Sequence, residues 1–463
     1  MNQTINILLD DNIKVDNNAF ELVRKMTELP YVEHVAVVPD FHFKNKMEAP
    51  SSIAVATGDC MVPHFTSCSL NCGMGLLNTQ IRRRDFDLKA TIEFFRQLRA
   101  TEHEREVFDI NHSELERTLR GGAEYICEKY SLPFSWLDKV EERGKLATNG
   151  KPLELDVDDI LDRDDLRNPN YQGLRNLGLG FGGNHFVELQ EVTEIIDTQL
   201  CRDNGIRLGD TVIMYHGGGG IVPGFIGGYF ANRLLGYSND MRLLYNKVKF
   251  HFGTLKNLNR FNQRWKYYFS KKRFVQIQEE TPEGIRVNAA HAASMNYGYA
   301  YRMVAVARLL RALRKGFSEP NLRVELLHDS SHNHILKEVL DGKPLWLHRH
   351  NCCRVNMKSL NILPGFHTTS SYIGIGLNGA KKYLNTMPHG AGHTINQYCE
   401  AGISVPIPNR MTQKFEDISE QPIEVQHISD EGIDSVVHIL LKNSIFKPIA
   451  RLTPFAVLKN YYR

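Results

Sequence analysis

Hydrophobic residues along the chain repeat with helical spacing in some segments and cluster as strands in others. The spacing predicts helices over 18–28 and 191–203, two amphipathic helices within 84–130, and a long Ala-rich helix over 286–315. Short apolar runs predict strands over 33–38, ending at Pro39-Asp40, within 52–78, near the end of 173–189, and over 209–215. The final third alternates short strands with Gly-rich loops, and no sequence repeat is present. The pattern predicts a mixed protein of helices and strands.

Composition narrows the class of protein. The chain has 463 residues, 42% of them hydrophobic, and a formal net charge of +3. These values exclude global disorder, and no window approaches the roughly 20 apolar residues of a membrane helix. The length allows two or three domains or one large elaborated domain. Because the first 16 residues lack a basic region followed by an apolar core, we expect a cytoplasmic protein with no membrane partner. Its eight cysteines form no CxxC pair, which argues against a zinc ribbon or a disulfide framework.

Two polar segments interrupt the apolar pattern. The segment 143–170 is turn-rich and acidic, and we expect a surface excursion there. The segment 242–273 contains ten Lys and Arg, no Asp or Glu, and many aromatic residues. This composition suits contact with RNA phosphates and stacking on unpaired bases. The alternative is a helical hairpin whose aromatics pack inward and whose cations are only solvated. The cations expected to bind RNA are Arg260, Arg264, Lys271 and Lys272.

Five short segments combine histidine or cysteine with glycine or other small or polar residues. They are SLNCGMG (69–75), GFGGNHFVE (180–188), YHGGGG (215–220), HDSSHN (328–333) and HGAGH (389–393). Glycine beside histidine leaves room for an anion, while imidazole and thiolate can bind a borderline-soft metal such as Zn, Mn, Fe or Co. Two metals in one site can stabilise phosphoryl transfer. The residues alone therefore predict a metal-dependent phosphotransfer or hydrolytic site.

The collinear order of these segments resembles the RtcB family of GTP- and manganese-dependent RNA ligases, from Val38-Pro39-Asp40-Phe41-His42 to Lys459. The resemblance implies a single large α+β domain, spanning 1–463, with central packed β-sheets surrounded by helices and a metal site in a cleft. The segments 143–170 and 242–273 would be elaborations of its surface. It implies joining of 2′,3′-cyclic-phosphate or 3′-phosphate RNA ends to 5′-hydroxyl ends through a guanylylated histidine, as in RNA repair and tRNA splicing.

The resemblance also assigns roles to residues. His389 would be the guanylylated nucleophile, with Asp40 near the reaction centre. The metal ligands would be Cys72, His185, His216 and His332, and the nucleotide-site residues would be Asn184, Glu188, Ser370, Ser371 and Lys459. Four of them have plainer alternatives. His185 could be a core histidine at a strand end, His332 a turn residue paired with an asparagine, Cys72 simply buried, and Lys459 solvated. Asn296 and Arg302 match an N…R pair of the family's long helix.

The chain departs from the family pattern at charged positions. Ser69 stands where the family has a metal-binding aspartate, so the second of two Mn²⁺ ions is expected to bind weakly or not at all. The arginine of the family's HSGSRG motif is absent from 216–220. The arginine of its HGAGR motif is replaced by His393.

Three functions therefore remain open. The first is an RtcB-like RNA ligase using GTP, and the second is a divergent metal-dependent enzyme with another acceptor or phosphoester hydrolysis. The third is a non-catalytic RNA-end-binding protein. The expected partners are RNA and GTP, and the need for an archease-like activator stays open.

Overall fold

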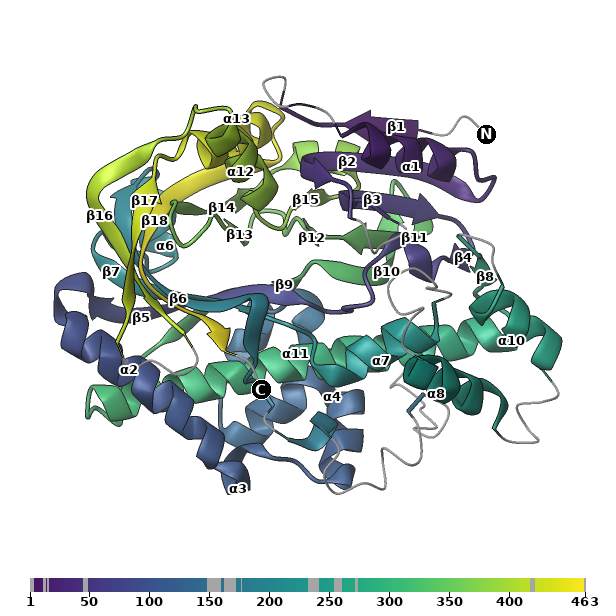
Figure 1. Cartoon of the computed structure of the whole chain (residues 1–463), viewed down its shortest axis with the longest axis horizontal. Helices are drawn as coiled ribbons and strands as arrows, with labels where there is room; N and C mark the ends of the chain where they lie inside the picture. The colour runs from purple at the N-terminus through teal and green to yellow at the C-terminus, as the bar shows by residue number, and fades with distance from the viewer. Residues whose placement is uncertain are drawn as a thin grey trace.

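The computed structural model describes residues 4–10, 14, 16–44, 49–147, 160–161, 172–175, 177–231, 241–253, 260–270, 274–416 and 421–461. Their strands form two large sheets, and most of the helices lie around them (Figure 1). The α+β class and the single large domain expected from the resemblance are confirmed. The predicted excursion 143–170 lies mostly outside the described residues, although Ile160 and Leu161 are buried.

A nine-stranded sheet forms the centre of the molecule. Its main path is β13 (Leu360–Leu363), β14 (Ser371–Gly376), β18 (Phe446–Tyr461), β6 (Phe181–Ile195), β7 (Asp210–Gly217), β5 (Gly73–Arg82) and β9 (Glu325–Ser331). The remaining two strands are β16 (Pro406–Phe415) and β17 (Ile423–Ile428), and β16 joins β18. Because the terminal strands β9 and β13 lie side by side, the sheet is nearly closed.

A five-stranded sheet packs beside it. Its order is β1 (Thr4–Ile7), β2 (Val32–His42), β3 (Ser51–Thr57), β11 (Lys343–His350) and β10 (Asn333–Leu340). Two-stranded pairs join β12 (Cys352–Arg354) to β15 (Thr386–Pro388), and β4 (Cys60–Met61) to β8 (Ile277–Gln278).

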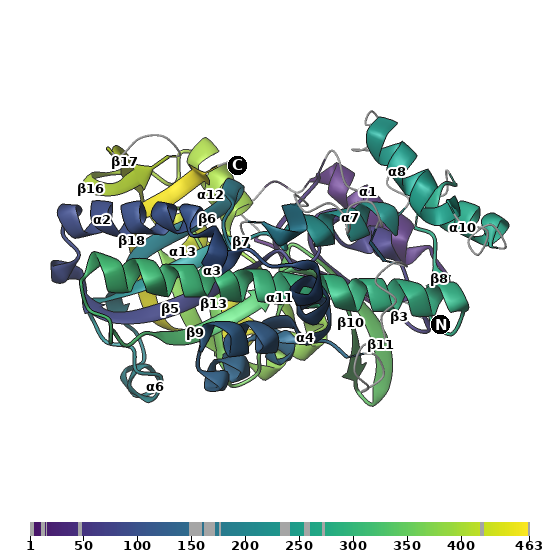
Figure 2. The same ribbon diagram turned by 90° about the horizontal axis from the view of Figure 1, so that it is seen from below.

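The long helix α11 (Pro282–Gly316) runs along the central sheet and packs against α2 (Leu88–Ala100), α4 (His112–Tyr130) and α7 (Ile221–Tyr229), as Figure 2 shows from below. Burial all along α11 explains its Ala-rich sequence, since small side chains allow close packing. The other helices are α1 (Asn17–Thr27), α3 (Arg105–Phe108), α6 (Thr198–Asp203), α8 (Met241–Phe252), α10 (Phe261–Tyr268), α12 (Gly392–Glu400) and α13 (Glu431–Lys442).

Two sequence predictions were wrong in detail. The predicted helix 191–203 is strand to Ile195, because Val192 and its neighbours pair with β18, and helix begins only at Thr198 with Asp197 as its N-cap. The strand at 33–38 continues past Pro39, because an irregularity in its pairing with β3 between Val37 and His42 accommodates the proline.

Candidate metal centre and active site

A cysteine and two histidines converge where three neighbouring strands of the central sheet begin or end. The ligand atoms of Cys72, His185 and His216 all lie within 4.8 Å of one another. The thiol sulfur of Cys72 lies 3.3 Å from His185 Nε2 and 3.2 Å from His216 Nε2. Strand pairing fixes this arrangement, since Met74 of β5 and Phe186 of β6 both lie opposite His216 of β7. The structure thus brings together three of the four predicted metal ligands.

The turn before Cys72 is held by a buried arginine. Arg302 of α11 donates from Nη1 to the backbone oxygen of Asn71 at 2.6 Å, and it pairs with Asp329 of β9 at 2.8 Å. A Cβ atom on Gly73 would lie 2.6 Å from the Arg302 guanidinium carbon, so only glycine fits there. Arg302 therefore holds in place the turn that carries the Cys72 thiol. Asn296, its partner in the predicted pair, instead donates to the backbone oxygen of Leu119 at 2.9 Å.

The glycine run after His216 is also explained by close packing. A Cβ atom on Gly218 would lie 2.9 Å from the His185 ring, and one on Gly219 would lie 2.1 Å from the backbone oxygen of Leu70. Larger residues at these positions would displace a candidate ligand or the loop before Cys72.

The protonation of His216 suits metal binding. Its Nδ1 lies 3.1 Å from the backbone oxygen of Asn184, which can only accept, so Nδ1 carries the proton and Nε2 keeps a free lone pair toward Cys72. Burial lowers the pKa of His185 to about 4 and that of His216 well below its usual value. Burial also raises the pKa of the Cys72 thiol to about 12, so the thiol is protonated until a cation replaces its proton.

His332 and His389 extend this cluster into a row of imidazoles. The ring of His332 lies 5.1 Å from that of His216, and the ring of His389 lies 4.6 Å beyond it, between centroids. The backbone N–H of His332 donates to the oxygen of Cys72 at 2.9 Å, which ties the two candidate ligands together. Within the described part of the chain, the buried Nδ1 of His332 has no hydrogen-bond partner. An unpartnered buried nitrogen beside a thiol and two imidazoles fits a metal ion.

His389 is held as a neutral base with one nitrogen available. Its Nδ1 lies 2.9 Å from the backbone oxygen of Asn351 and must donate to it, which leaves Nε2 unprotonated. Burial, with a contribution from Lys44, lowers the pKa of His389 to about 3. The backbone N–H of Ala391 donates to the oxygen of Pro364 at 3.1 Å, so the loop at Pro364-Gly365 contacts the His389 loop.

Asp40 supports the helix that follows His389. It is buried, and its carboxylate accepts from the backbone N–H of Thr394 at 3.0 Å in the first turn of α12. Burial raises the pKa of Asp40 to about 7. Close by, the rings of His42 and His393 stack with their centroids 4.4 Å apart. His393, which replaces an arginine of the family pattern, is thereby fixed at the end of β2.

A family model described as tRNA-splicing ligase RtcB matches residues 22–460. The chain belongs to the RtcB family. Curated relatives named tRNA-splicing ligase RtcB include one from Pyrobaculum aerophilum, which is 23% identical over 91% of this chain and 87% of its own length. A second, from Methanococcus maripaludis, is 22% identical over 98% of this chain and 93% of its own, and a third, from Nanoarchaeum equitans, is 23% identical over 99% and 96%. The low identities make this chain a divergent member.

In this RtcB-family chain, the position of the missing aspartate is filled by a serine hydroxyl. The Ser69 side chain lies near the Cys72 thiol and opposes the effect of burial on its pKa, and the Ser69 backbone oxygen accepts from the Cys72 N–H at 3.3 Å. Among the residues that the structure describes, no carboxylate joins the group formed by Cys72, His185 and His216.

Two of the predicted nucleotide-site residues share one hydrogen-bond network. Gln190 donates from Nε2 to Glu188 at 2.7 Å and to the Ser371 hydroxyl at 3.3 Å. Burial raises the pKa of Glu188 to about 7, and Lys459 on the neighbouring strand opposes this shift. Ser370, in contrast, donates its hydroxyl to Asp430 at 2.6 Å. The side chain of Asn184 is exposed beside the metal cluster.

Sequence reasoning missed Lys44. This lysine follows β2, and burial lowers its pKa while the nearby Asp40 and Cys72 oppose that effect. It also contributes to lowering the pKa values of His332 and His389. Lys44 therefore lies close enough to the histidine cluster to act on it electrostatically. Its position four residues after Asp40 was the available signal, but a single lysine in a short motif does not indicate which way its side chain points.

The basic segment contains both surface and buried cations. Arg260 is exposed, whereas Arg264 is buried, donates to the backbone oxygen of His251 at 2.9 Å and pairs with Glu283 at 3.3 Å. The Arg264 guanidinium thus joins α10 to α11 inside the protein and is not available on the surface. Lys271 and Lys272 lie outside the described residues.

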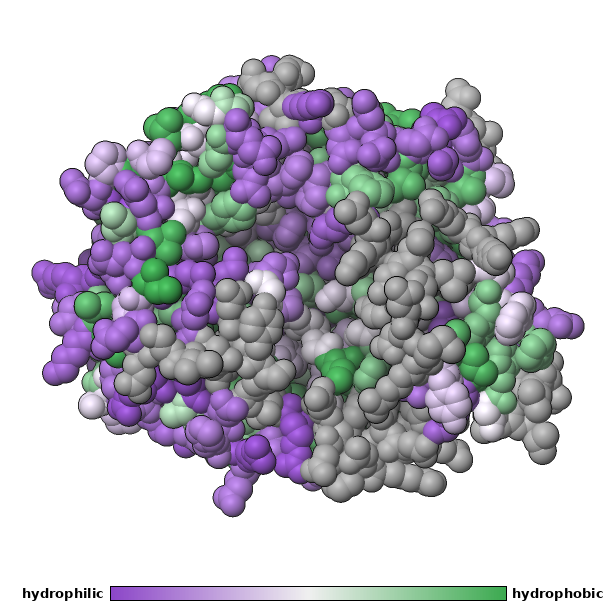
Figure 3. Space-filling view, in the orientation of Figure 1, coloured by the Kyte–Doolittle hydropathy of each residue, from purple (hydrophilic) through white to green (hydrophobic). Residues whose placement is uncertain are grey.

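The aromatics of the same segment divide similarly. His251 stacks on Tyr268 at 4.1 Å inside the protein, while Tyr245, Phe261 and Trp265 remain exposed. Figure 3 shows apolar side chains at the right-hand edge, where α10 lies in Figure 1. The described part of the segment thus has an inward aromatic layer and an exposed face with aromatic and basic residues. Contact of this face with RNA stays a prediction. No helix among the described residues is long and apolar enough to span a bilayer.

Proposed function

We propose that this protein is an RNA ligase that joins 2′,3′-cyclic-phosphate or 3′-phosphate ends to 5′-hydroxyl ends through a guanylylated His389. Membership of a family whose curated members are named tRNA-splicing ligases supports the RNA ligase activity. The observation that carries the chemistry is the continuous row of imidazoles from His216 through His332 to His389, next to Cys72.

His389 has the properties of a phosphorus nucleophile. It is neutral at physiological pH, and the bond from Nδ1 to Asn351 directs the lone pair to Nε2. Attack of Nε2 on the α-phosphorus of GTP forms an N–P bond, breaks the bond to the β-phosphate oxygen and releases pyrophosphate. A 2′,3′-cyclic phosphate is first hydrolysed by water to a 3′-phosphate. An oxygen of the RNA 3′-phosphate then attacks the phosphorus of the bound GMP and breaks its bond to His389. The 5′-hydroxyl finally attacks the RNA phosphorus of this activated end and releases GMP.

The same site would hold Mn²⁺. Cys72, His185 and His216 would be its ligands, with His332 completing the set through its unpartnered nitrogen. A bound cation neutralises the charge that develops on transferred phosphate oxygens. Lys44 adds a protein cation to the same region, which offsets part of the charge lost with the family's arginines.

The guanine nucleotide would lie near Glu188, Ser371 and Lys459, because the hydrogen-bond network through Gln190 joins the first two and the third is electrostatically coupled to Glu188. RNA would contact the exposed face that includes Arg260 and Trp265, where aromatic rings and cations alternate. An archease-like activator is a further proposed partner.

A second candidate function is favoured by Ser69. With a hydroxyl in place of a carboxylate beside Cys72, the site provides one strong ligand set, which suits a single-metal enzyme with another acceptor or a phosphoesterase.

The joining reaction itself separates the candidates. A radiolabelled RNA with a 2′,3′-cyclic-phosphate end is incubated with a 5′-hydroxyl RNA, Mn²⁺ and GTP, with and without archease. We expect a joined product that requires GTP and is absent with His389→Ala. Loss of the terminal phosphate without joining would favour the phosphoesterase.

A further inference from the structure

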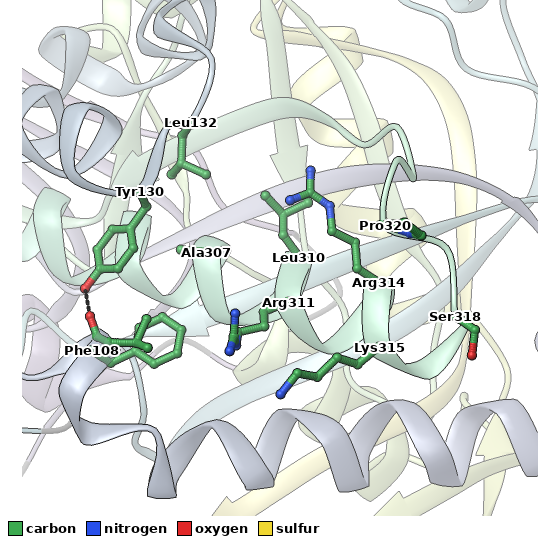
Figure 4. A pocket seen from close by; sticks show the side chains of 11 residues that line it. Phe108, Tyr130, Leu132, Ala307, Leu310, Arg311, Arg314, Lys315, Ser318 and Pro320 are labelled. Atoms are coloured by element: carbon green, nitrogen blue, oxygen red, sulfur yellow. Dashed lines mark hydrogen bonds between the residues drawn. The ribbon is translucent and has the colours of Figure 1, made fainter.

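A cavity lies between α3, the end of α4 and the C-terminal part of α11 (Figure 4). Its volume is about 590 Å³, within the range of roughly 300–1,000 Å³ that is typical of small-molecule sites. None of its lining residues belongs to the metal and nucleotide site described above. It is therefore a separate place on the molecule where a ligand can be accommodated.

The floor and one wall of this cavity are apolar. They are formed by Phe108, Tyr130, Leu132, Ala307 and Leu310. The rings of Phe108 and Tyr130 stack with centroids 5.6 Å apart and planes 27° from parallel. An apolar ligand body would be stabilised by burying its surface against this wall.

The aromatic wall is rigid. The Arg308 guanidinium carbon lies 3.9 Å from the centre of the Phe108 ring, and Arg308 is anchored by donating to the backbone oxygen of Leu177 at 2.6 Å. The Tyr130 hydroxyl donates to the backbone oxygen of Val107 at 3.1 Å. Because contacts within the protein hold both rings in place, little conformational entropy would be lost on binding.

The rim of the cavity is cationic. Arg311, Arg314 and Lys315 project from one face of α11 (Figure 4). Glu104 forms ion pairs with Arg311 and Lys315, so one carboxylate faces two cations. Arg314 is exposed and forms no ion pair within the described part of the chain. The rim thus carries excess positive charge directly beside an apolar floor.

We propose that this cavity binds a small amphipathic anion, a molecule with an aromatic or aliphatic body and a single acidic group. The body would lie on the Phe108 and Tyr130 wall, and the acidic group would reach Arg314. This occupant matches both the volume of the cavity and the arrangement of charge around it, and it is independent of the RNA ligase chemistry.

The test uses the full-length protein and 8-anilinonaphthalene-1-sulfonate, an aromatic anion whose fluorescence rises in apolar surroundings. We expect saturable binding of one molecule per chain. Arg314→Glu should weaken it at least tenfold, whereas Arg207→Glu, an exposed arginine elsewhere, should leave it unchanged. Ala307→Trp should also weaken it, because the larger side chain fills the cavity. Unchanged circular dichroism would show that the variants are folded.

Two further probes make the outcome decisive. Uncharged N-phenyl-1-naphthylamine should bind the wild type and Arg314→Glu equally, and octyl sulfate should displace the anionic probe. Equal affinity of the anionic probe for Arg314→Glu and Arg207→Glu would overturn the proposal. Displacement by a short RNA or an acidic peptide but not by octyl sulfate would also overturn it, since the cavity would then belong to a macromolecular surface.

Discussion

The imidazole of His389 lies 4.6 Å from that of His332, and only His332 separates it from the Cys72–His216 pair. The candidate nucleophile and the candidate metal ligands therefore form one continuous group, although they come from segments far apart in the sequence. The proposed attack of His389 Nε2 on a phosphate held at the metal requires this proximity.

Substitution of Cys72 tests the metal centre. Cys72→Ala removes the sulfur that lies within 3.3 Å of both His185 and His216, so bound Mn²⁺ should fall at least tenfold. Metal content of the purified protein, measured by mass spectrometry after equilibration with Mn²⁺, checks this. Cys399→Ser, in α12, is the matched control and should retain the metal. Full metal content in Cys72→Ala would place the ion elsewhere.

Restoring the carboxylate tests the departure at Ser69. Because the Ser69 side chain lies near the Cys72 thiol, Ser69→Asp should add an anionic ligand and tighten Mn²⁺ binding by about tenfold or more. Calorimetric titration with Mn²⁺ measures the change, and Ser131→Asp, on the surface after α4, controls for added charge. Equal affinity in both variants would show that the hydroxyl position is not part of the metal site.

The buried ion pair of Arg302 is expected to be essential for stability. Arg302→Met leaves Asp329 as an uncompensated buried carboxylate and releases Asn71, which should cost about 3–5 kcal/mol of unfolding free energy. Urea unfolding measures it, with the exposed Arg323→Met as control. A loss below about 1 kcal/mol would mean that the turn before Cys72 is held by other contacts.

Buried neutral histidines should make the protein less stable in acid. His291 Nε2 accepts from the backbone N–H of Ile335, and His348 Nε2 accepts from that of Val62. Burial lowers their pKa values to about 3 and about 4, below the usual value of 6.5. The unfolded chain therefore binds more protons below pH 6.5, so stability is complete above that pH and is lost as the pH falls.

At pH 5 each of these two histidines should cost about 2 kcal/mol relative to pH 7.5. Asp40 and Glu188 act in the opposite direction, because burial raises their pKa values to about 7. Other buried histidines, among them His185, His334 and His389, also have pKa values lowered by burial and add to the loss. Urea unfolding at the two pH values should therefore show a net loss, and His291→Gln should reduce it. An unfolding free energy that rises on acidification would contradict the assignment of buried neutral imidazoles.

Two arginines of the basic segment should behave differently. Arg260→Ala should weaken RNA binding, because an exposed contact to an RNA phosphate is lost. The slope of the logarithm of the binding constant against the logarithm of salt concentration should fall by about one. Arg264→Ala should instead lower the unfolding temperature, because it removes one of the two buried arginines that pair with Glu283. Gel-shift titrations over a range of salt and thermal unfolding separate the two effects, and the reverse pattern would contradict the positions of these side chains.

The sequence motifs predicted which residues come together in the candidate site, but not how the charged side chains around it are placed. The collinear motifs indicated Cys72, His185, His216, His332 and His389, and the structure brings these side chains together. The motifs could not indicate that Arg264 is buried, because the orientation of a cation in a charged segment depends on Glu283 in another helix. Nor could they reveal Lys44, whose role depends on how β2 ends beside His389.

The most direct test of the account is the transfer of label from α-labelled GTP onto the purified protein in the presence of Mn²⁺, followed on a denaturing gel. The account predicts a covalent guanylyl adduct that is absent with His389→Ala and retained with His438→Ala, a matched exposed histidine in α13. No adduct on metal-loaded wild-type protein, or an adduct that persists in His389→Ala, would contradict it.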